Sequence, residues 1–271
     1  MYSGASGGAE VTEAIQRVET LQSSPGLVPL RFSALKNMAQ SPAHYAYSRR
    51  NDRAQTKALR LGNCLDRLVS AEDQSDVAIA TTCAELLKPA GKKATGPSEA
   101  GLVLGMLEAL QNHADAWGLL REGTRQRKLH WEFAGRACSG TPDTFTRSRV
   151  VDLKSTRCSS PAWFNRDGRF RGYHAQLSYY ATGLCCSGLA EPEEHILVTV
   201  ENTPPHPVTV FELTPAAKLA GEKLWRSWFE RLMVCEASDV FPGYVESRVP
   251  FDVPDDGELT LVIDGEETEI E

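Results

Sequence analysis

The sequence predicts an α/β fold with a central mixed β-sheet flanked by helices. Short strands are expected within residues 131–154, where charged and apolar side chains alternate, and two apolar strands at 195–200 and 208–213 extend the sheet. Segments 98–117 and 215–236 have the apolar spacing of amphipathic helices. With 271 residues, the chain is long enough to bury a substantial core in one large domain.

Capping residues and chain breakers predict the remaining elements. Serine and threonine favour helix N-caps, proline favours the first helical turn, and Pro-Gly pairs break the chain. The expected elements are helices beginning at Ser33, Pro42 and Thr56, a strand with a short helix at 77–87, a loop at 156–172 and a helix at 173–188. Arginine and aromatic residues are frequent in the expected loop.

The ends of the chain differ in composition from its middle. Residues 1–26 are rich in Gly and Ser and are predicted to be a mobile tail, and residues 27–250 are predicted to form the domain. Residues 251–271 are predicted to be an acidic extension with a hairpin around Asp264 and Gly265. No apolar signal segment and no run of 18 apolar residues occurs, so a cytoplasmic protein without membrane contact is expected.

Charge is distributed unevenly along the chain. The net charge is −7, but residues 121–171 hold twelve Lys and Arg against five acids, whereas residues 236–271 hold twelve acids and one base. A local basic surface, rather than the global charge, binds phosphates. The basic stretch therefore suggests contact with nucleic acid, although a solvated protein face explains that stretch alone equally well.

Two carboxylates and a lysine are predicted to converge within residues 131–154. Asp152 and Lys154 alternate with Leu153 on one strand, so they point to the same face. A turn at 147–149 would bring Asp143 nearly opposite Asp152. Neighbouring carboxylates repel each other unless a cation lies between them, and hard oxygen ligands suit Mg²⁺ or Mn²⁺. The alternative is a surface hairpin with an Asp152–Lys154 salt bridge.

The order and spacing of several motifs resemble those of the PD-(D/E)XK nuclease superfamily. Pro142-Asp143 precedes the triplet Asp152-Leu153-Lys154, and a Gln176-x-x-x-Tyr180 motif follows on a predicted helix. Segments 30–47 and 112–133 also resemble nucleases of the exonuclease VIII type from phages and prophages. The resemblance extends over about 30–244.

This resemblance implies a restriction-endonuclease-like fold and a set of site residues. Asp143, Asp152 and the Leu153 carbonyl would hold Mg²⁺, for which Mn²⁺ can substitute. Lys154 would position or activate the attacking water, Glu132 would assist from a neighbouring strand, and Gln176 would orient the site. Some relatives hold an iron–sulfur cluster, but the seven irregularly spaced cysteines do not supply that pattern, so no cluster is expected.

One position departs from the family pattern. Members of the family carry a glycine followed four residues later by a histidine that reaches the metal site, whereas here Gly62 is followed by Asp66. Asp66 would serve as an oxygen ligand, directly or through water, or it would be an ordinary surface residue of the helix. Both interpretations stay open at the level of sequence.

The resemblance also implies a substrate and partners. Arg166, Arg169, Arg171 and Tyr180 would bind DNA, although a loop packed over the core explains the arginines equally well. The expected activity is degradation of one strand of linear duplex DNA, 5′ to 3′, in phage-type recombination in a bacterial or phage-infected cell. A homo-oligomeric ring and a single-strand annealing protein would be partners. The alternatives are a RecB-like or structure-specific endonuclease, and a DNA-binding module with a decayed site.

Overall fold

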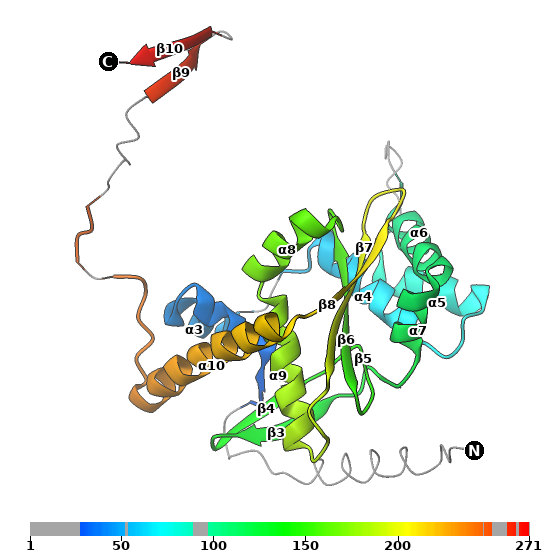
Figure 1. Cartoon of the computed structure of the whole chain (residues 1–271), viewed down its shortest axis with the longest axis horizontal. Helices are drawn as coiled ribbons and strands as arrows, with labels where there is room; N and C mark the ends of the chain where they lie inside the picture. The colour runs from blue at the N-terminus through cyan, green and yellow to red at the C-terminus, as the bar shows by residue number, and fades with distance from the viewer. Residues whose placement is uncertain are drawn as a thin grey trace.

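The structure is a computed structural model, and it describes residues 28–51, 54–88, 97–245, 247–250, 259–263 and 266–270. The predicted N-terminal tail lies outside these ranges. The described residues form an α/β fold in which mixed sheets are flanked by helices, so the predicted fold class is confirmed (Figure 1). No helix among the described residues has the length and apolar character needed to cross a membrane.

The larger sheet has five strands in the order β2-β5-β6-β7-β8. Strands β6 and β7 run parallel, and the other neighbouring pairs are antiparallel. The strands are β2 (Thr124–Arg125), β5 (Thr144–Phe145), β6 (Arg149–Thr156), β7 (Glu194–Glu201) and β8 (Val208–Glu212). The two apolar segments predicted to extend the sheet behind the site are therefore confirmed as β7 and β8.

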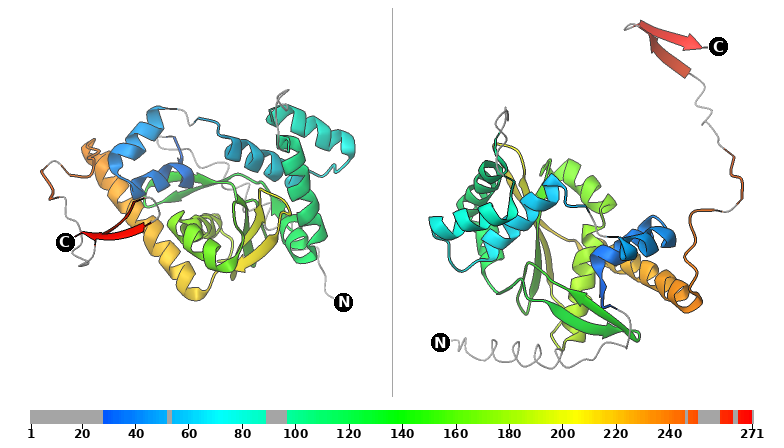
Figure 2. Two further views of the ribbon diagram at one scale, coloured as in Figure 1. Left: turned by 90° about the horizontal axis from the view of Figure 1, so that it is seen from above. Right: turned by 180° about the vertical axis from the view of Figure 1, so that it is seen from behind.

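One face of this sheet is covered by four helices that precede it in the chain (Figures 1 and 2). They are α4 (Lys57–Ser70), α5 (Asp76–Leu86), α6 (Glu99–Asn112) and α7 (Ala114–Arg121). Val151 and Leu153 of β6 are buried in the same apolar cluster as the core residues of these helices. The alternation along β6 thus directs its apolar side chains to this face.

The opposite face is covered by helices that follow β6 and by a smaller sheet. The helices are α8 (Pro161–Phe170), α9 (Tyr173–Cys186) and α10 (Pro215–Ser238). The smaller sheet has the order β1-β4-β3, with β1 (Leu30–Arg31), β4 (Arg136–Gly140) and β3 (Leu129–Phe133). Trp131 of β3 packs against Tyr179 of α9, with 4.9 Å between the ring centroids. Aromatic side chains therefore join the smaller sheet to the helical layer.

The first described helices pack beside α10. They are α2 (Phe32–Leu35), the 3₁₀ helix η1 (Lys36–Ala39) and α3 (Pro42–Arg50). Ser41 caps α3 by accepting the backbone N–H of His44, and Pro42 occupies the first turn, as the sequence predicts. Phe32 lies 6.2 Å from Trp228 of α10, centroid to centroid.

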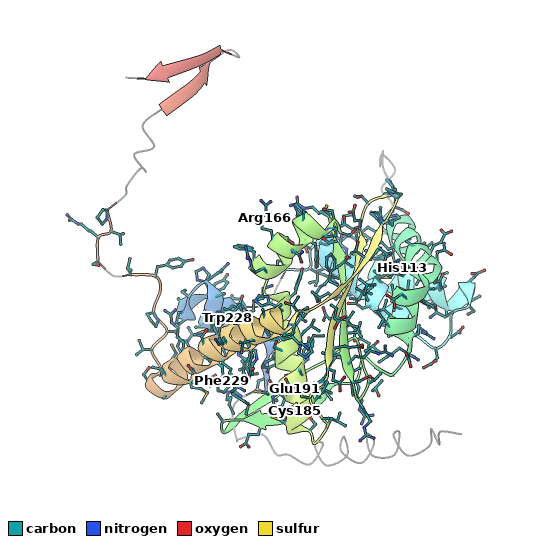
Figure 3. The ribbon with its side chains drawn as sticks, in the orientation of Figure 1. His113, Arg166, Cys185, Glu191, Trp228 and Phe229 are labelled. Atoms are coloured by element: carbon teal, nitrogen blue, oxygen red, sulfur yellow. The ribbon has the colours of Figure 1, made fainter. Side chains whose placement is uncertain are left out.

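Three local predictions are wrong. Residues 77–87, expected to begin as a strand, lie almost entirely in helix α5. The helix expected at 98–117 is broken at His113, whose ring accepts the N–H of Ala116 at 3.2 Å and caps α7 (Figure 3). Residues 156–172, expected to be a loop, contain helix α8.

The C-terminal hairpin is present as the antiparallel pair β9 (Leu259–Ile263) and β10 (Glu266–Ile270), although Asp264 and Gly265 lie outside the described residues.

Candidate active site

The candidate site lies where strands β5 and β6 separate. Strand β5 begins at Thr144, which pairs with Val151 of β6. One residue earlier, Asp143 has left the strand, and its Oδ2 accepts the backbone N–H of Leu153 at 2.6 Å. The N–H and C=O of one strand residue point to the same edge, so the Leu153 carbonyl faces the same side as the Asp143 carboxylate.

Asp152 and Lys154 lie on the face of β6 opposite the buried Val151 and Leu153. Asp152 is only 2% exposed, and its Oδ2 forms an ion pair with the Lys154 ammonium. The predicted turn before β6 and the position of Asp143 beside Asp152 are confirmed by the strand register. The fold therefore brings the two carboxylates and the lysine together.

Helix α9 contributes the polar partners of this group. The Gln176 side-chain amide donates to Asp152 Oδ1 at 3.2 Å and to the Tyr180 hydroxyl at 2.9 Å. Lys154 Nζ lies over the ring of Tyr173, 5.1 Å from its centroid, a distance at which a cation is attracted to the ring face. Gly172, at φ 71°, turns the chain into α9 just before Tyr173.

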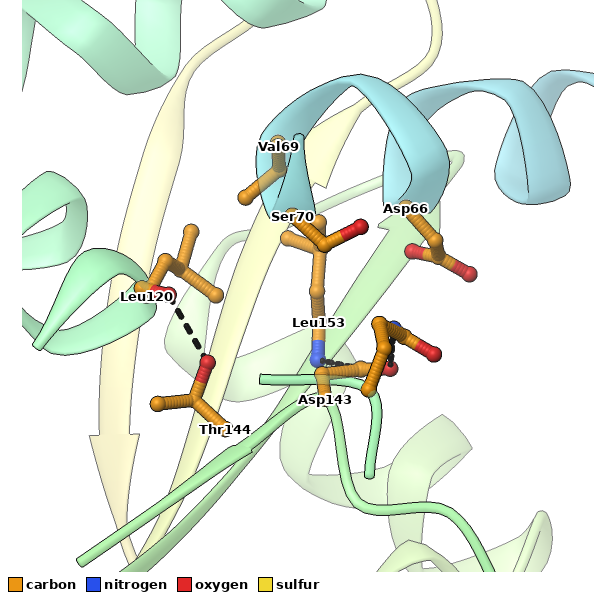
Figure 4. A pocket seen from close by; sticks show the side chains of 8 residues that line it. Asp66, Val69, Ser70, Leu120, Asp143, Thr144 and Leu153 are labelled. Carbon is orange, nitrogen blue, oxygen red and sulfur yellow. Dashed lines mark hydrogen bonds between the residues drawn. The ribbon is translucent and has the colours of Figure 1, made fainter. Parts of the chain in front are cut away.

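Helix α4 contributes Asp66. Its carboxylate points toward Asp143 across a small pocket, which Val69 and Ser70 also line (Figure 4). Burial raises the pKa of Asp66 well above its usual range, and the Asp143 charge raises it further. Of the two interpretations left open by the sequence, this position favours a residue of the site over an ordinary surface residue.

Gln126 is a site residue that the sequence analysis missed. Its side-chain amide donates to Asp143 Oδ1 at 2.7 Å, and its backbone N–H donates to the Asp143 carbonyl at 2.9 Å. Gln126 has a left-handed backbone, with φ of 47°. This conformation is uncommon for a residue other than glycine and costs free energy. Nothing in the local sequence around Gln126 signals this contact.

The electrostatics of the site leave negative charge in excess. Burial and, to a lesser extent, the neighbouring Asp152 charge raise the pKa of Asp143 to about 7, against the opposing effect of Lys154. Burial disfavours the charge on Lys154, but Asp152 and Asp143 outweigh that effect and raise its pKa. Lys154 is therefore a cation and a hydrogen-bond donor here, facing three carboxylates.

The oxygen atoms of the site suit a hard divalent cation by their chemistry. Within the described residues, no three His, Cys, Asp or Glu side chains are close enough to form a metal cluster on their own. However, the buried Asp152 carboxylate shares Lys154 with its neighbours, and the charges of Asp143 and Asp152 raise the pKa of Asp66, as expected for carboxylates that lie close together. By their chemistry, the donors that would hold a divalent cation are the oxygens of Asp143, Asp152 and Asp66 and the Leu153 carbonyl.

The structure does not bring every predicted residue to this group. Glu132 is exposed on β3, in the smaller sheet, and none of the described contacts joins it to the group. Arg166, which Figure 3 labels, lies on α8 with Arg169, and Arg171 directly follows the helix. All three are exposed, and Arg171 pairs with Asp167. Their helix leads from β6 to α9, so it borders the site without entering it.

The sequence matches one protein family over most of its length. Residues 31–248 match the PDDEXK-like domain of unknown function (DUF3799), and the chain belongs to this family. The predicted membership of the PD-(D/E)XK superfamily is thereby confirmed. No curated protein matches the sequence.

The fold also resembles solved structures. A candidate exonuclease from Eubacterium rectale has a TM-score of 0.63 and 12% identity, over 93% of this chain and 96% of that chain. An alkaline exonuclease from Laribacter hongkongensis has a TM-score of only 0.26 and 17% identity, over 68% and 98% of the two chains, so this second likeness carries no argument. Fold and family together are those of the PD-(D/E)XK superfamily.

Proposed function

We propose that the protein hydrolyses phosphodiester bonds of DNA with Mg²⁺. The observation that supports this function is the convergence of Asp143, Asp152 and Lys154 at the separation of two strands, in a member of the PDDEXK-like family. Bound by the site's oxygens, Mg²⁺ would polarise a phosphoryl oxygen and acidify a bound water. Mn²⁺ would substitute for it.

The protein's own groups would orient the reaction. Lys154, held between Asp152 and the Tyr173 ring, would donate a hydrogen bond to the attacking water or to a phosphate oxygen. Gln176 would fix the Asp152 carboxylate, and Gln126 would fix that of Asp143. Positioning of this kind contributes to catalysis because the groups need not reorganise during the reaction.

In its finer form, the proposal is an exonuclease that degrades one strand of linear duplex DNA. The resemblance to exonuclease VIII supports this form, together with 5′ to 3′ polarity, a ring of identical subunits and a strand-annealing partner in recombination. The exposed Arg166 and Arg169 beside the site would contact the DNA backbone. The location of Asp66 beside Asp143 favours an intact site over a decayed one.

Digestion of end-labelled linear duplex DNA with Mg²⁺ tests this function, with covalently closed circular duplex as the comparison. Loss of one strand from linear DNA only is expected, and Lys154→Ala should abolish it. Lys223→Ala, which changes an exposed lysine of α10, is the matched control and should retain activity. Cutting of the circle would identify an endonuclease. DNA binding without cleavage in either Mg²⁺ or Mn²⁺ would identify a decayed module.

A further inference from the structure

A second hollow lies beside the candidate active site, on the face of the sheet that carries α8, α9 and α10. Its cavity volume is about 260 Å³, slightly below the usual range for clefts that bind drug-sized molecules. Helix α8, the start of α9, strand β8 and the start of α10 line it. The proposed hydrolysis assigns no role to this hollow.

Aromatic rings form one wall of the hollow and connect it to the site. Phe164 stacks on Phe211 with ring centroids 4.8 Å apart and on Tyr173 with centroids 5.9 Å apart, and both pairs are nearly parallel. Tyr173 also contacts Lys154, whose Nζ lies 5.1 Å from the ring centroid. A molecule in the hollow would therefore be one side chain away from the lysine of the active site.

Polar and apolar side chains together line the rest of the hollow. Asn165, Arg169 and Glu212 are exposed lining residues, while Leu197 and Leu213 are buried. Amide and carboxylate groups pair with the edges of nucleobases, and arginine binds phosphate. Flat apolar walls with a few polar groups are the environment in which proteins hold an extruded base.

We infer that this hollow, termed the base pocket, holds one unstacked nucleobase of the DNA strand that is cut. The inference rests on the proposed function, because DNA must reach the site for its neighbouring base to enter. A base of a nucleotide close to the scissile phosphate would lie against the aromatic wall, and Arg169 would face the backbone. Extrusion costs least at a frayed end or in a single strand, so the base pocket would favour such substrates.

The test fills the base pocket and removes single bases from the DNA. Ala217→Phe places a ring in the pocket from α10, and Ala220→Phe is a second filling variant for the case that the first fails to fold. Ala216→Phe adds the same ring at an exposed neighbouring residue that does not line the pocket, and it is the control. Thermal melting first establishes that each variant is folded.

Binding is measured with Ca²⁺ in place of Mg²⁺, on oligonucleotide duplexes with one abasic site at successive positions from the end. One position should weaken binding roughly tenfold in the wild type and in Ala216→Phe, the effect expected for one stacked base. Ala217→Phe should bind intact DNA about tenfold more weakly and lose no further affinity at that position, because the two changes remove the same contact.

Two results would overturn the base pocket. One is that no abasic position weakens DNA binding by the wild type, or that the wild type does not bind DNA at all. The other is a base dependence that persists unchanged in both filling variants. Cleavage in Mg²⁺ is measured separately. Base dependence without cleavage would refute the nuclease and leave the pocket standing, whereas cleavage without base dependence would refute the pocket alone.

Discussion

The charged side chains at the two ends of helix α4 differ in whether they have a partner of opposite charge. Near its start, Arg60 forms an ion pair with Glu99 of α6, and their side chains are 9% and 12% exposed. Toward its end, Asp66 faces Asp143 and Asp152, and the Lys154 charge lowers its pKa against theirs. Hydrogen bonding to Arg60 lowers the pKa of Glu99, whereas burial raises the pKa of Asp66.

The two ends of α4 therefore differ in charge balance. At the Arg60 end, each charge has a partner, and the Glu99 carboxylate also accepts the N–H of Lys88 at 3.1 Å. At the Asp66 end, the protein supplies more carboxylates than cations. Such an excess of negative charge is balanced where a cation or other ligand binds. Carboxylates with raised pKa values in a hollow are therefore candidates for a functional site. Four changes test this comparison.

The largest effect is expected from neutralising the most buried carboxylate of the site. Asp152→Asn keeps the shape of the side chain but removes a charge that Lys154 and the proposed cation both use. Cleavage should fall by about a thousandfold or more. Single-turnover digestion measures the loss, and Asp115→Asn, on the exposed side of α7, is the control. Near-normal cleavage by Asp152→Asn would remove Asp152 from the site.

Breaking the ion pair between Arg60 and Glu99 should lower the stability of the fold and leave the rate of DNA cleavage unchanged. Arg60→Met leaves Glu99 without its partner, so the free energy of unfolding should fall. Urea unfolding measures this change. Replacing Glu99 by Leu in the same protein should recover part of the loss, because no lone charge is left. Cleavage per folded molecule should stay constant, and a large fall in that rate would contradict the contrast between the two ends.

Variants of Asp66 test whether this residue binds the proposed metal ion. Asp66→Asn should reduce cleavage by about 10- to 100-fold and weaken activation by Mg²⁺, whereas Asp66→His should retain more activity, since histidine also ligates metals. A second readout is independent of activity: Mg²⁺ should raise the melting temperature of the wild type more than that of Asp66→Asn. Equal Mg²⁺ dependence in all three proteins would make Asp66 an ordinary helix residue.

Much of this site is predictable from sequence because local periodicity determines it. Alternation along β6 places Asp152 beside Lys154, the turn before β6 returns Asp143 to them, and helical spacing puts Gln176 and Tyr180 one turn apart. The confirmed strands β7 and β8 are rich in the β-branched and apolar residues that favour strands, and β7 is buried along most of its length. These features need only neighbours within a few residues or one hairpin.

The remainder depends on contacts that no local pattern encodes. Glu132 was expected beside the other acids, but β3 pairs with β4, and β4 pairs with β1, so Glu132 lies in a different sheet. Short apolar runs such as 77–87 suit a strand or a helix, and packing against α4 decides for the helix. Residues 161–170, expected to lie in a loop, form helix α8 because Phe164 is buried against Phe211 and Tyr173.

Variants of Gln126 should change the cleavage rate least. They also separate the role of its side-chain amide from the strain of its backbone. Its left-handed backbone is strained, while its amide supports Asp143. Gln126→Ala and Gln126→Gly both remove the amide, so both should slow cleavage by about fivefold to tenfold, which corresponds to the loss of one hydrogen bond worth about 1 kcal/mol. Only glycine relieves the backbone, so the Gly variant should be more stable than the Ala variant by about 1 kcal/mol in thermal or urea unfolding. Equal stability of the two variants would show that the backbone at Gln126 is not strained in solution. Unchanged cleavage in both would show that the Asp143 carboxylate holds its position through the Leu153 N–H alone.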